Sequence, residues 1–204
     1  MKKFELTTEF ITNMFGKKLF RIKALVEFGN VKAGELGGYV EKEENVSQAD
    51  NAWVSGDAEV FGNAKVYDNA WVSGDARVSG NARVSGDARV SGNAWVRGNA
   101  RVYGDARVSG NAWVSGNARV SGNAWVYGDA DYALVQGFGT EFRCTTFYRG
   151  KNKKIMVNCG CFHGDLEGFR KQVKETRNGK IAKEYLMIAD LMEYHFTSED
   201  SSDE

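Results

Sequence analysis

Between residues 51 and 130, apolar and polar positions alternate in units of six, as in Asn-Ala-Trp-Val-Ser-Gly. Valine recurs at every sixth position from Val54 to Val126, and alanine does so from Ala52 to Ala130. Within a unit, Ala-x-Val-x predicts a short strand with alanine and valine on one face. The next pair, Gly-Asn or Gly-Asp, predicts a turn, because these residues tolerate left-handed backbone. Such small apolar faces cannot be buried alone, so the units must stack into a solenoid.

This repeat resembles the hexapeptide repeat of left-handed parallel β-helices, in which an aliphatic residue begins each unit. In that superfamily three units complete a triangular coil of about 18 residues, and left-handedness is implied by the resemblance alone. Three further segments make the chain similar to uncharacterised phage and prophage proteins described as polymer-forming or as acyltransferases. They are Gly34-Glu-Leu-Gly-Gly-Tyr-Val, Thr145-Thr-Phe-Tyr-Arg and Lys183-Glu-Tyr-Leu-Met-Ile-Ala-Asp-Leu.

A coil of that length places the variable residue between alanine and valine on three outer faces. The first face would stack Trp53, Trp71, Arg89, Arg107 and Trp125. The second would stack Glu59, Arg77, Trp95 and Trp113. The third would stack Lys65, Arg83, Arg101 and Arg119, with Tyr67 and Tyr103 beside them. All five tryptophans of the protein are therefore expected on the outer surface.

These outward side chains predict a protein-binding surface, with Arg97 among its rim residues. Tryptophan and arginine are enriched at binding hot spots, and large exposed aromatic patches usually have a partner. Two alternatives are burial of some tryptophans under the terminal segments and a carbohydrate platform. The basic column is expected to be a solvated face. Binding of a nucleic-acid backbone there is less favoured, because 27 basic residues balance 27 acidic ones.

The regions outside the repeat predict different structures. Residues 1–50 predict a β cap with a strand over residues 20–24 and an irregular first coil. Residues 51–131 form the predicted solenoid. Residues 132–197 predict three strands and two helices, and the acidic residues 198–204 predict disorder.

Within the C-terminal region, the three predicted strands cover residues 132–136, 142–149 and 154–159. Asp165 is a candidate cap for the first helix, and Asn178-Gly179 would end it.

Catalytic chemistry is not expected from the repeats, because residues 51–130 contain no histidine. Left-handed β-helix acyltransferases generally use a histidine base, and carbonic anhydrases of this fold bind zinc through coil histidines. The resemblance therefore implies no catalytic residue in this solenoid. We expect neither an enzyme nor a cofactor.

One cluster outside the repeats is a candidate metal site. Cys159, Cys161 and His163 alternate along a predicted strand, and Cys144 on the preceding strand would complete a Cys₃His zinc site. Strand cysteines are more often small core residues, so we expect no metal. A Cys161–His163 nucleophile pair is disfavoured further, because no third orienting group is visible.

Composition predicts a soluble cytoplasmic protein, located in the host cytoplasm if a phage encodes it. The chain has only three cysteines, no apolar run after its basic start, and no stretch of membrane-spanning length. We therefore interpret it as a mainly β, non-enzymatic, phage-associated β-helix protein that binds protein through its outer faces. The partner would be another copy, giving a homo-oligomer, or a host protein, as for phage inhibitors of bacterial defence systems such as CRISPR.

Two rival interpretations remain from the resemblance. One is a degenerate hexapeptide-repeat acyltransferase. The other is a bactofilin-like protein that polymerises end to end. The non-repetitive sequences at both ends of the chain argue against this second interpretation.

Overall fold

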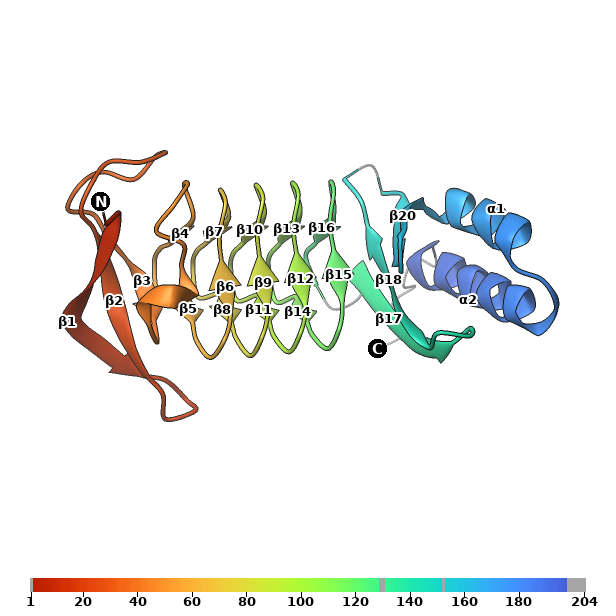
Figure 1. Cartoon of the computed structure of the whole chain (residues 1–204), viewed down its shortest axis with the longest axis horizontal. Helices are drawn as coiled ribbons and strands as arrows, with labels where there is room; N and C mark the ends of the chain where they lie inside the picture. The colour runs from red at the N-terminus through yellow and green to blue at the C-terminus, as the bar shows by residue number, and fades with distance from the viewer. Residues whose placement is uncertain (1, 129–130, 152, 198–204) are drawn as a thin grey trace, which may run out of the picture.

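The computed structural model describes residues 2–128, 131–151 and 153–197, and it shows a rod of stacked coils (Figure 1). A β hairpin lies at the N-terminal end, and a β-sheet with two helices lies at the C-terminal end. The chain is thus mainly β, as predicted. Ala130 and the acidic tail over residues 198–204, for which disorder was predicted, lie outside the described residues.

Each unit of six contributes a two-residue strand, and three consecutive strands belong to three different sheets. Val90 pairs in parallel with Val72 on one side and Val108 on the other, so one coil takes 18 residues, as predicted. The inward valines and alanines from Ala52 to Val126 are buried. The strands are β4 (Trp53–Val54), β5 (Glu59–Val60), β6 (Lys65–Val66), β7 (Trp71–Val72), β8 (Arg77–Val78), β9 (Arg83–Val84), β10 (Arg89–Val90), β11 (Trp95–Val96), β12 (Arg101–Val102), β13 (Arg107–Val108), β14 (Trp113–Val114), β15 (Arg119–Val120) and β16 (Trp125–Val126).

The corner glycines allow neighbouring coils to stack closely. Gly86 has φ 68°, and a Cβ atom built on it would lie 2.9 Å from the backbone nitrogen of Gly104. A larger residue would therefore strain the backbone and collide with the next coil. Asp68 replaces glycine at one corner with φ 57°, and its carboxylate accepts a hydrogen bond from the Gly86 amide.

The N-terminal cap extends one sheet of the solenoid. Strands β1 (Phe4–Thr12) and β2 (Lys18–Ala24) form an antiparallel hairpin, and β2 pairs with β3 (Leu36–Val40). Strand β3 then pairs in parallel with β5, and the short helix η1 (Glu43–Asn45) follows it. The strand predicted over residues 20–24 lies within β2, whereas β1 was not predicted.

The C-terminal region contains four strands, so the prediction of three was wrong. They are β17 (Tyr132–Phe138), β18 (Arg143–Arg149), β19 (Ile155–Cys159) and β20 (Phe162–Asp165), followed by α1 (Leu166–Thr176) and α2 (Gly179–Thr197). Strand β20 exists because Gly160 and Cys161 form a two-residue turn that reverses the chain. As predicted, Asp165 caps α1, and its Oδ1 accepts a hydrogen bond from the Gly168 amide at 2.9 Å.

One face of this sheet packs on the last coil and the other packs on the helices (Figure 1). On the solenoid side, Thr146 Oγ1 accepts from the Arg119 amide, and Asn158 Nδ2 donates to the Arg119 carbonyl. Tyr148 and Ser121 complete a buried polar junction with Asn158. None of the helices in the described parts of the chain has the length and apolar character needed to span a membrane.

Candidate protein-binding surface

Three outer faces run along the solenoid. We call the outer side of β5, β8, β11 and β14 the tryptophan face, that of β6, β9, β12 and β15 the basic face, and that of β4, β7, β10, β13 and β16 the mixed face. The registers Trp95↔Trp113, Trp53↔Trp71 and Arg101↔Arg119 place side chains on these faces as predicted.

Trp95 and Trp113 form the centre of the tryptophan face. Their rings are stacked, with centroids 5.2 Å apart and planes inclined by 9°. Trp95 Nε1 donates to Ser79 Oγ at 3.2 Å, and the Arg97 guanidinium lies 4.3 Å from the Trp113 ring centroid and 5.2 Å from that of Trp95. Trp113 is 40% exposed. The pair therefore presents a flat, ordered apolar surface with a cation at its edge.

The turn between β1 and β2 extends this surface towards the N-terminus. The Phe15 ring lies 5.8 Å from Trp95 and 5.7 Å from Phe61, and it is itself 52% exposed. Met14 beside it is 70% exposed. Periodicity alone could not identify Met14 and Phe15, because they lie outside the repeat. Phe61 was visible in the sequence only as a phenylalanine where most units have serine.

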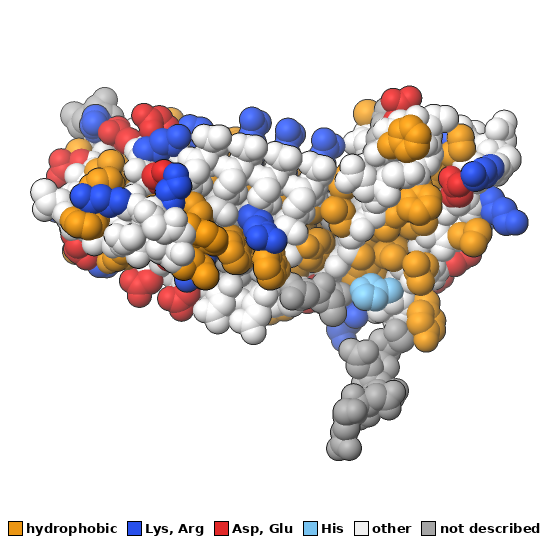
Figure 2. All heavy atoms as spheres, turned by 90° about the horizontal axis from the view of Figure 1, so that it is seen from below, with side chains coloured by type: hydrophobic (Ala, Val, Ile, Leu, Met, Phe, Trp, Pro, Cys, Tyr) orange, Lys and Arg blue, Asp and Glu red, His pale blue; other side chains and the backbone are white. Residues whose placement is uncertain are grey.

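The surface continues towards the C-terminus at β17. A hollow of about 390 Å³ is lined by Arg97, Trp113, Ser115, Tyr132 and Leu134. The Tyr132 hydroxyl donates to the Trp113 carbonyl, so the C-terminal sheet is attached directly to this face. Figure 2 shows hydrophobic side chains along this side of the solenoid and across the C-terminal region.

Arg77, also predicted as a binding residue, is held within the protein. Its Nε atom lies 3.6 Å from a carboxylate oxygen of Glu59, and its Nη1 atom contacts the sulfur of Met14. Glu59 is buried and accepts a hydrogen bond from Asn13 Nδ2 at 3.4 Å. Arg77 thus helps to fix the hairpin on the coils.

Trp53 lies on the outer side of its coil, but the prediction that it belongs to an accessible binding surface was wrong. Its side chain is fully buried, with its ring centroid 6.2 Å from that of Phe4 and 5.4 Å from that of Phe28. The N-terminal cap covers it, which was the alternative considered for some tryptophans. Trp71 is half-buried, and its Nε1 donates to Ser55 Oγ at 3.1 Å.

The rest of the mixed face is more polar. Arg89 and Arg107 are exposed, and the Arg107 guanidinium lies 5.6 Å from the Trp125 ring. Trp125 is half-buried and meets Tyr127 edge to face at 5.8 Å. Two arginines therefore separate Trp71 from Trp125, so this face has no aromatic stack like that of Trp95 and Trp113.

The four residues of the candidate zinc site are not brought together. Cys144 Sγ donates to the Asn117 carbonyl on the solenoid side of the sheet, whereas Cys159 Sγ accepts from Thr145 Oγ1 on the helix side. Cys161 lies in the turn between β19 and β20, so the alternation of side chains along β19 does not extend to it. His163 Nδ1 lies 2.7 Å from Asn158 Oδ1. Within the described residues, no group of three or more His, Cys, Asp and Glu could hold a metal ion.

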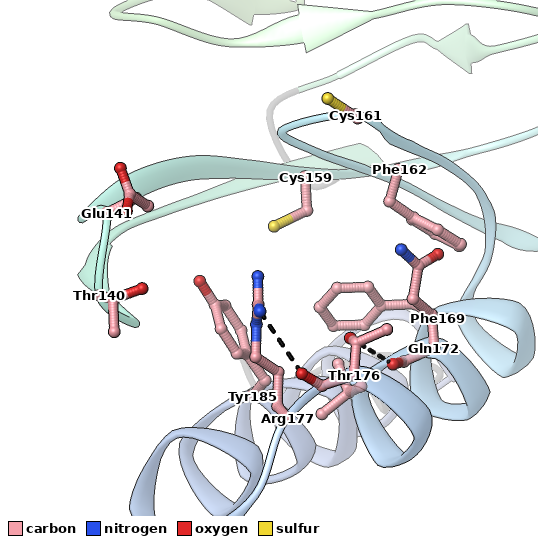
Figure 3. Close-up of a pocket in the computed structure, with 11 residues that line it drawn as sticks. Thr140, Glu141, Cys159, Cys161, Phe162, Phe169, Gln172, Thr176, Arg177 and Tyr185 are labelled. Carbon is pink, nitrogen blue, oxygen red and sulfur yellow. Dashed lines mark hydrogen bonds between the residues drawn. The ribbon is translucent and has the colours of Figure 1, made fainter.

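A cavity of about 230 Å³ lies between the C-terminal sheet and the helices, and Figure 3 shows the residues that line it. Cys159 points into it towards the helices, and Tyr185 and Arg177 come from the opposite side. The Arg177 guanidinium donates to the neighbouring Thr176 carbonyl, and Phe169 packs against Tyr185. Cys159 therefore has the surroundings of a strand cysteine at the edge of a small core.

Comparison with known proteins agrees with the architecture. A family model described as YdcK beta solenoid repeat matches residues 76–92, 82–98, 100–116 and 112–128. These segments lie within the coils, and both ends of the chain fall outside them. No curated protein matches the chain. The matched repeats and the stacked coils together show that this chain is a β-solenoid protein.

Proposed function

We propose that this protein is a non-enzymatic binding module that contacts a partner protein through the tryptophan face. The observation that carries the proposal is the exposed stack of Trp95 and Trp113, with Arg97 over both rings. Trp and Arg contribute most of the affinity at many interfaces. Trp95 is ordered before binding by its hydrogen bond to Ser79 and its contact with Phe15, so its association loses little side-chain entropy.

The extent of the apolar surface supports the same proposal. Exposed hydrophobic side chains continue from Met14 and Phe15, across the tryptophan pair, to Leu134 on β17. Contiguous apolar surface of this kind marks interaction sites on proteins. The absence of histidine from residues 51–130 leaves the coils without the near-neutral base that left-handed β-helix acyltransferases, which the repeat resembles, generally use.

Two partners fit the proposal. The first is another copy of the chain, which would give a homo-oligomer joined through the tryptophan faces. The second is a bacterial protein, and the resemblance to phage proteins makes components of defence systems such as CRISPR the first candidates to test. Both partners would use the same anchors, so one set of variants tests both.

The decisive variant is Trp113→Ser, which removes the most exposed tryptophan from the stack. We expect it to weaken self-association or capture of the bacterial partner about thirtyfold, corresponding to roughly 2 kcal/mol for a true anchor. Light scattering gives the oligomer mass, and affinity capture with mass spectrometry identifies the partner.

Tyr127→Ser is the matched control, because Tyr127 is an exposed aromatic residue on the mixed face. Circular dichroism should show the same melting temperature for both variants. A protein captured by the wild type and by Tyr127→Ser, but not by Trp113→Ser, supports the proposal. Equal capture and equal mass for all three proteins would place the interface elsewhere. Turnover of acetyl-CoA would overturn the non-enzymatic part.

A further inference from the structure

The sequence distinguishes the basic face from the other two faces by one residue type. On the other faces, every charged residue between alanine and valine follows an aspartate by two positions. These units are Asp57-Ala-Glu59, Asp75-Ala-Arg77, Asp87-Ala-Arg89 and Asp105-Ala-Arg107. On the basic face the aspartate is always asparagine. These units are Asn63-Ala-Lys65, Asn81-Ala-Arg83, Asn99-Ala-Arg101 and Asn117-Ala-Arg119.

The structure shows what this difference does to the charge along the solenoid. The four asparagines form an uncharged ladder, with three Nδ2–Oδ1 hydrogen bonds of 3.1 Å between successive coils. At the corner that precedes it, the basic column therefore runs beside neutral amides, whereas the corner that follows it, beyond Tyr67 and Tyr103, carries Asp68, Asp87 and Asp105.

The three arginines of this column are exposed and adjacent. Arg101 is in register with Arg83 on one side and Arg119 on the other, so their backbones are about 4.8 Å apart. No carboxylate of the described residues forms an ion pair with any of the three guanidinium groups. Like charges at this spacing repel, and a ligand with several anionic groups would relieve that repulsion.

Tyrosines lie beside the arginines at every second coil. A hollow of about 240 Å³ is lined by Tyr67, Arg83, Ser85, Arg101, Tyr103 and Arg119. Tyr67 and Tyr103 are two coils apart, roughly 9.6 Å, with the small Ser85 between them. Tyr103 is 37% exposed. The arrangement combines a row of guanidinium groups with aromatic rings that flank an open space.

Both ends of this row are closed. At the N-terminal end, Lys65 Nζ donates to the Glu44 carbonyl, and Glu43 and Glu44 line the adjoining hollow. At the C-terminal end, the Arg119 backbone is bonded to Thr146 of the C-terminal sheet. The open row therefore spans three coils, which suits a short anionic segment and not a long duplex.

We propose that the basic face binds a short segment of single-stranded nucleic acid. The guanidinium groups of Arg83, Arg101 and Arg119 hold successive phosphates, and the bases stack on Tyr67 and Tyr103. Arginine offers paired N–H donors to phosphate oxygens, and aromatic rings stack bases of any sequence. The aromatic rings favour a nucleic acid over an acidic peptide, which would need only the cations.

Fluorescence anisotropy with labelled oligothymidylate and oligouridylate tests the proposal and shows whether DNA or RNA is preferred. With three phosphates neutralised, affinity should fall roughly twentyfold between 50 and 200 mM salt. We expect Arg83→Ser/Arg101→Ser to weaken binding at least tenfold. The matched control is Arg89→Ser/Arg107→Ser, which removes the same charge from adjacent coils of the mixed face.

Comparison of the two double variants distinguishes binding at the basic face from a general effect of positive charge. Loss of binding in the first double variant alone supports the basic face as the site. Equal loss in both double variants, or no binding by the wild type at 50 mM salt, overturns the proposal. Competition by oligoglutamate as strong as by an oligonucleotide of equal charge would assign the face to an acidic protein instead.

The tyrosines are tested separately with Tyr67→Ser/Tyr103→Ser. This variant should bind oligothymidylate about tenfold more weakly and bind inorganic polyphosphate, which has no bases, as well as the wild type does. Unchanged oligothymidylate binding, or equal losses for both ligands, would overturn the stacking of bases on these rings.

Discussion

At the scale of single residues, successive side chains of each strand have opposite environments. Val90 is fully buried among the valines and alanines of neighbouring coils, whereas Ser91 next to it faces outward and is half-buried. The repeated inward positions of the described coils contain only valine and alanine, so no larger side chain at these positions can absorb a change. Tolerance to substitution should therefore alternate along each strand.

Val90→Asp should unfold the solenoid, because it places an unpaired carboxylate in a core without a polar partner. Ser91→Asp should melt close to the wild-type temperature, because its carboxylate remains solvated. Thermal denaturation followed by circular dichroism compares the two. Equal melting temperatures would contradict this assignment of inside and outside.

At the scale of elements, the two-residue strands depend on the corners that join them. Most corners combine a glycine at positive φ with a backbone that touches the next coil, as at Gly86. Gly128, at the last described corner, has neither property: its φ is not positive, and no heavy atom of the described residues lies within 4 Å of a Cβ built on it. Substitutions at Gly86 and Gly128 therefore compare a corner that requires glycine with one that does not.

Gly86→Ala should destabilise the protein by about 2 kcal/mol, from the left-handed backbone alone, and by more where the new methyl meets Gly104. Gly128→Ala should be neutral or slightly stabilising, since it restricts only the unfolded chain. Denaturant unfolding measures both. A loss of stability in Gly128→Ala as large as in Gly86→Ala would show that corner conformation is not the cause.

The repeat elements could be predicted because one register explains every unit from Ala52 to Val126. Strand β1 could not, since Phe4–Thr12 alternates poorly and is held by its partner β2. Strand β20 was not predicted, because the alternation of Cys159, Cys161 and His163 indicates one continuous strand through Gly160 and Cys161. In the structure these two residues form a turn, and the pattern in the sequence does not distinguish the two cases. The candidate zinc site depended on that error.

At the scale of the whole molecule, the two ends of the rod decide which predicted binding residues are accessible. The repeat correctly placed Trp95 on Trp113, because both belong to the same register. It could not show that Phe4 and Phe28 cover Trp53, since those contacts come from non-repetitive sequence. Which side chains are buried at the ends of the rod depends on contacts with non-repetitive segments. The six-residue period carries no information about those contacts.

Lys3 joins the N-terminal cap to the first coil. Its ammonium group is buried and donates to the carbonyls of Ala49, Asp50 and Ala52 at 3.1, 3.2 and 2.9 Å. Burial lowers the pKa of Lys3 to about 8, while the nearby Asp50 carboxylate opposes this shift. Lys2 is exposed, and its pKa is raised by its hydrogen bond to Glu43.

The pKa of Lys3 predicts that the attachment of the cap responds to pH. Below about pH 8 both folded and unfolded chains hold the Lys3 proton, so its contribution is constant. Between about pH 8 and 10.5 the unfolded chain holds more protons, so the free energy of unfolding should rise with pH. Denaturant unfolding at several pH values should show this rise in the wild type and in Lys2→Met, and a smaller rise in Lys3→Met. Parallel curves for all three would exclude Lys3 as the cause.

The near-identity of the six-residue units also governs how such a chain can change length. Slippage between repeated coding segments removes or adds whole units. Loss of one unit between Trp95 and Trp113 would rotate every later side chain by one third of a turn, and Trp113 would no longer lie on Trp95. Loss of three units would shorten the rod and return each later residue to its original face, because partners are 18 residues apart. Functional relatives of different lengths should therefore differ by multiples of a full coil.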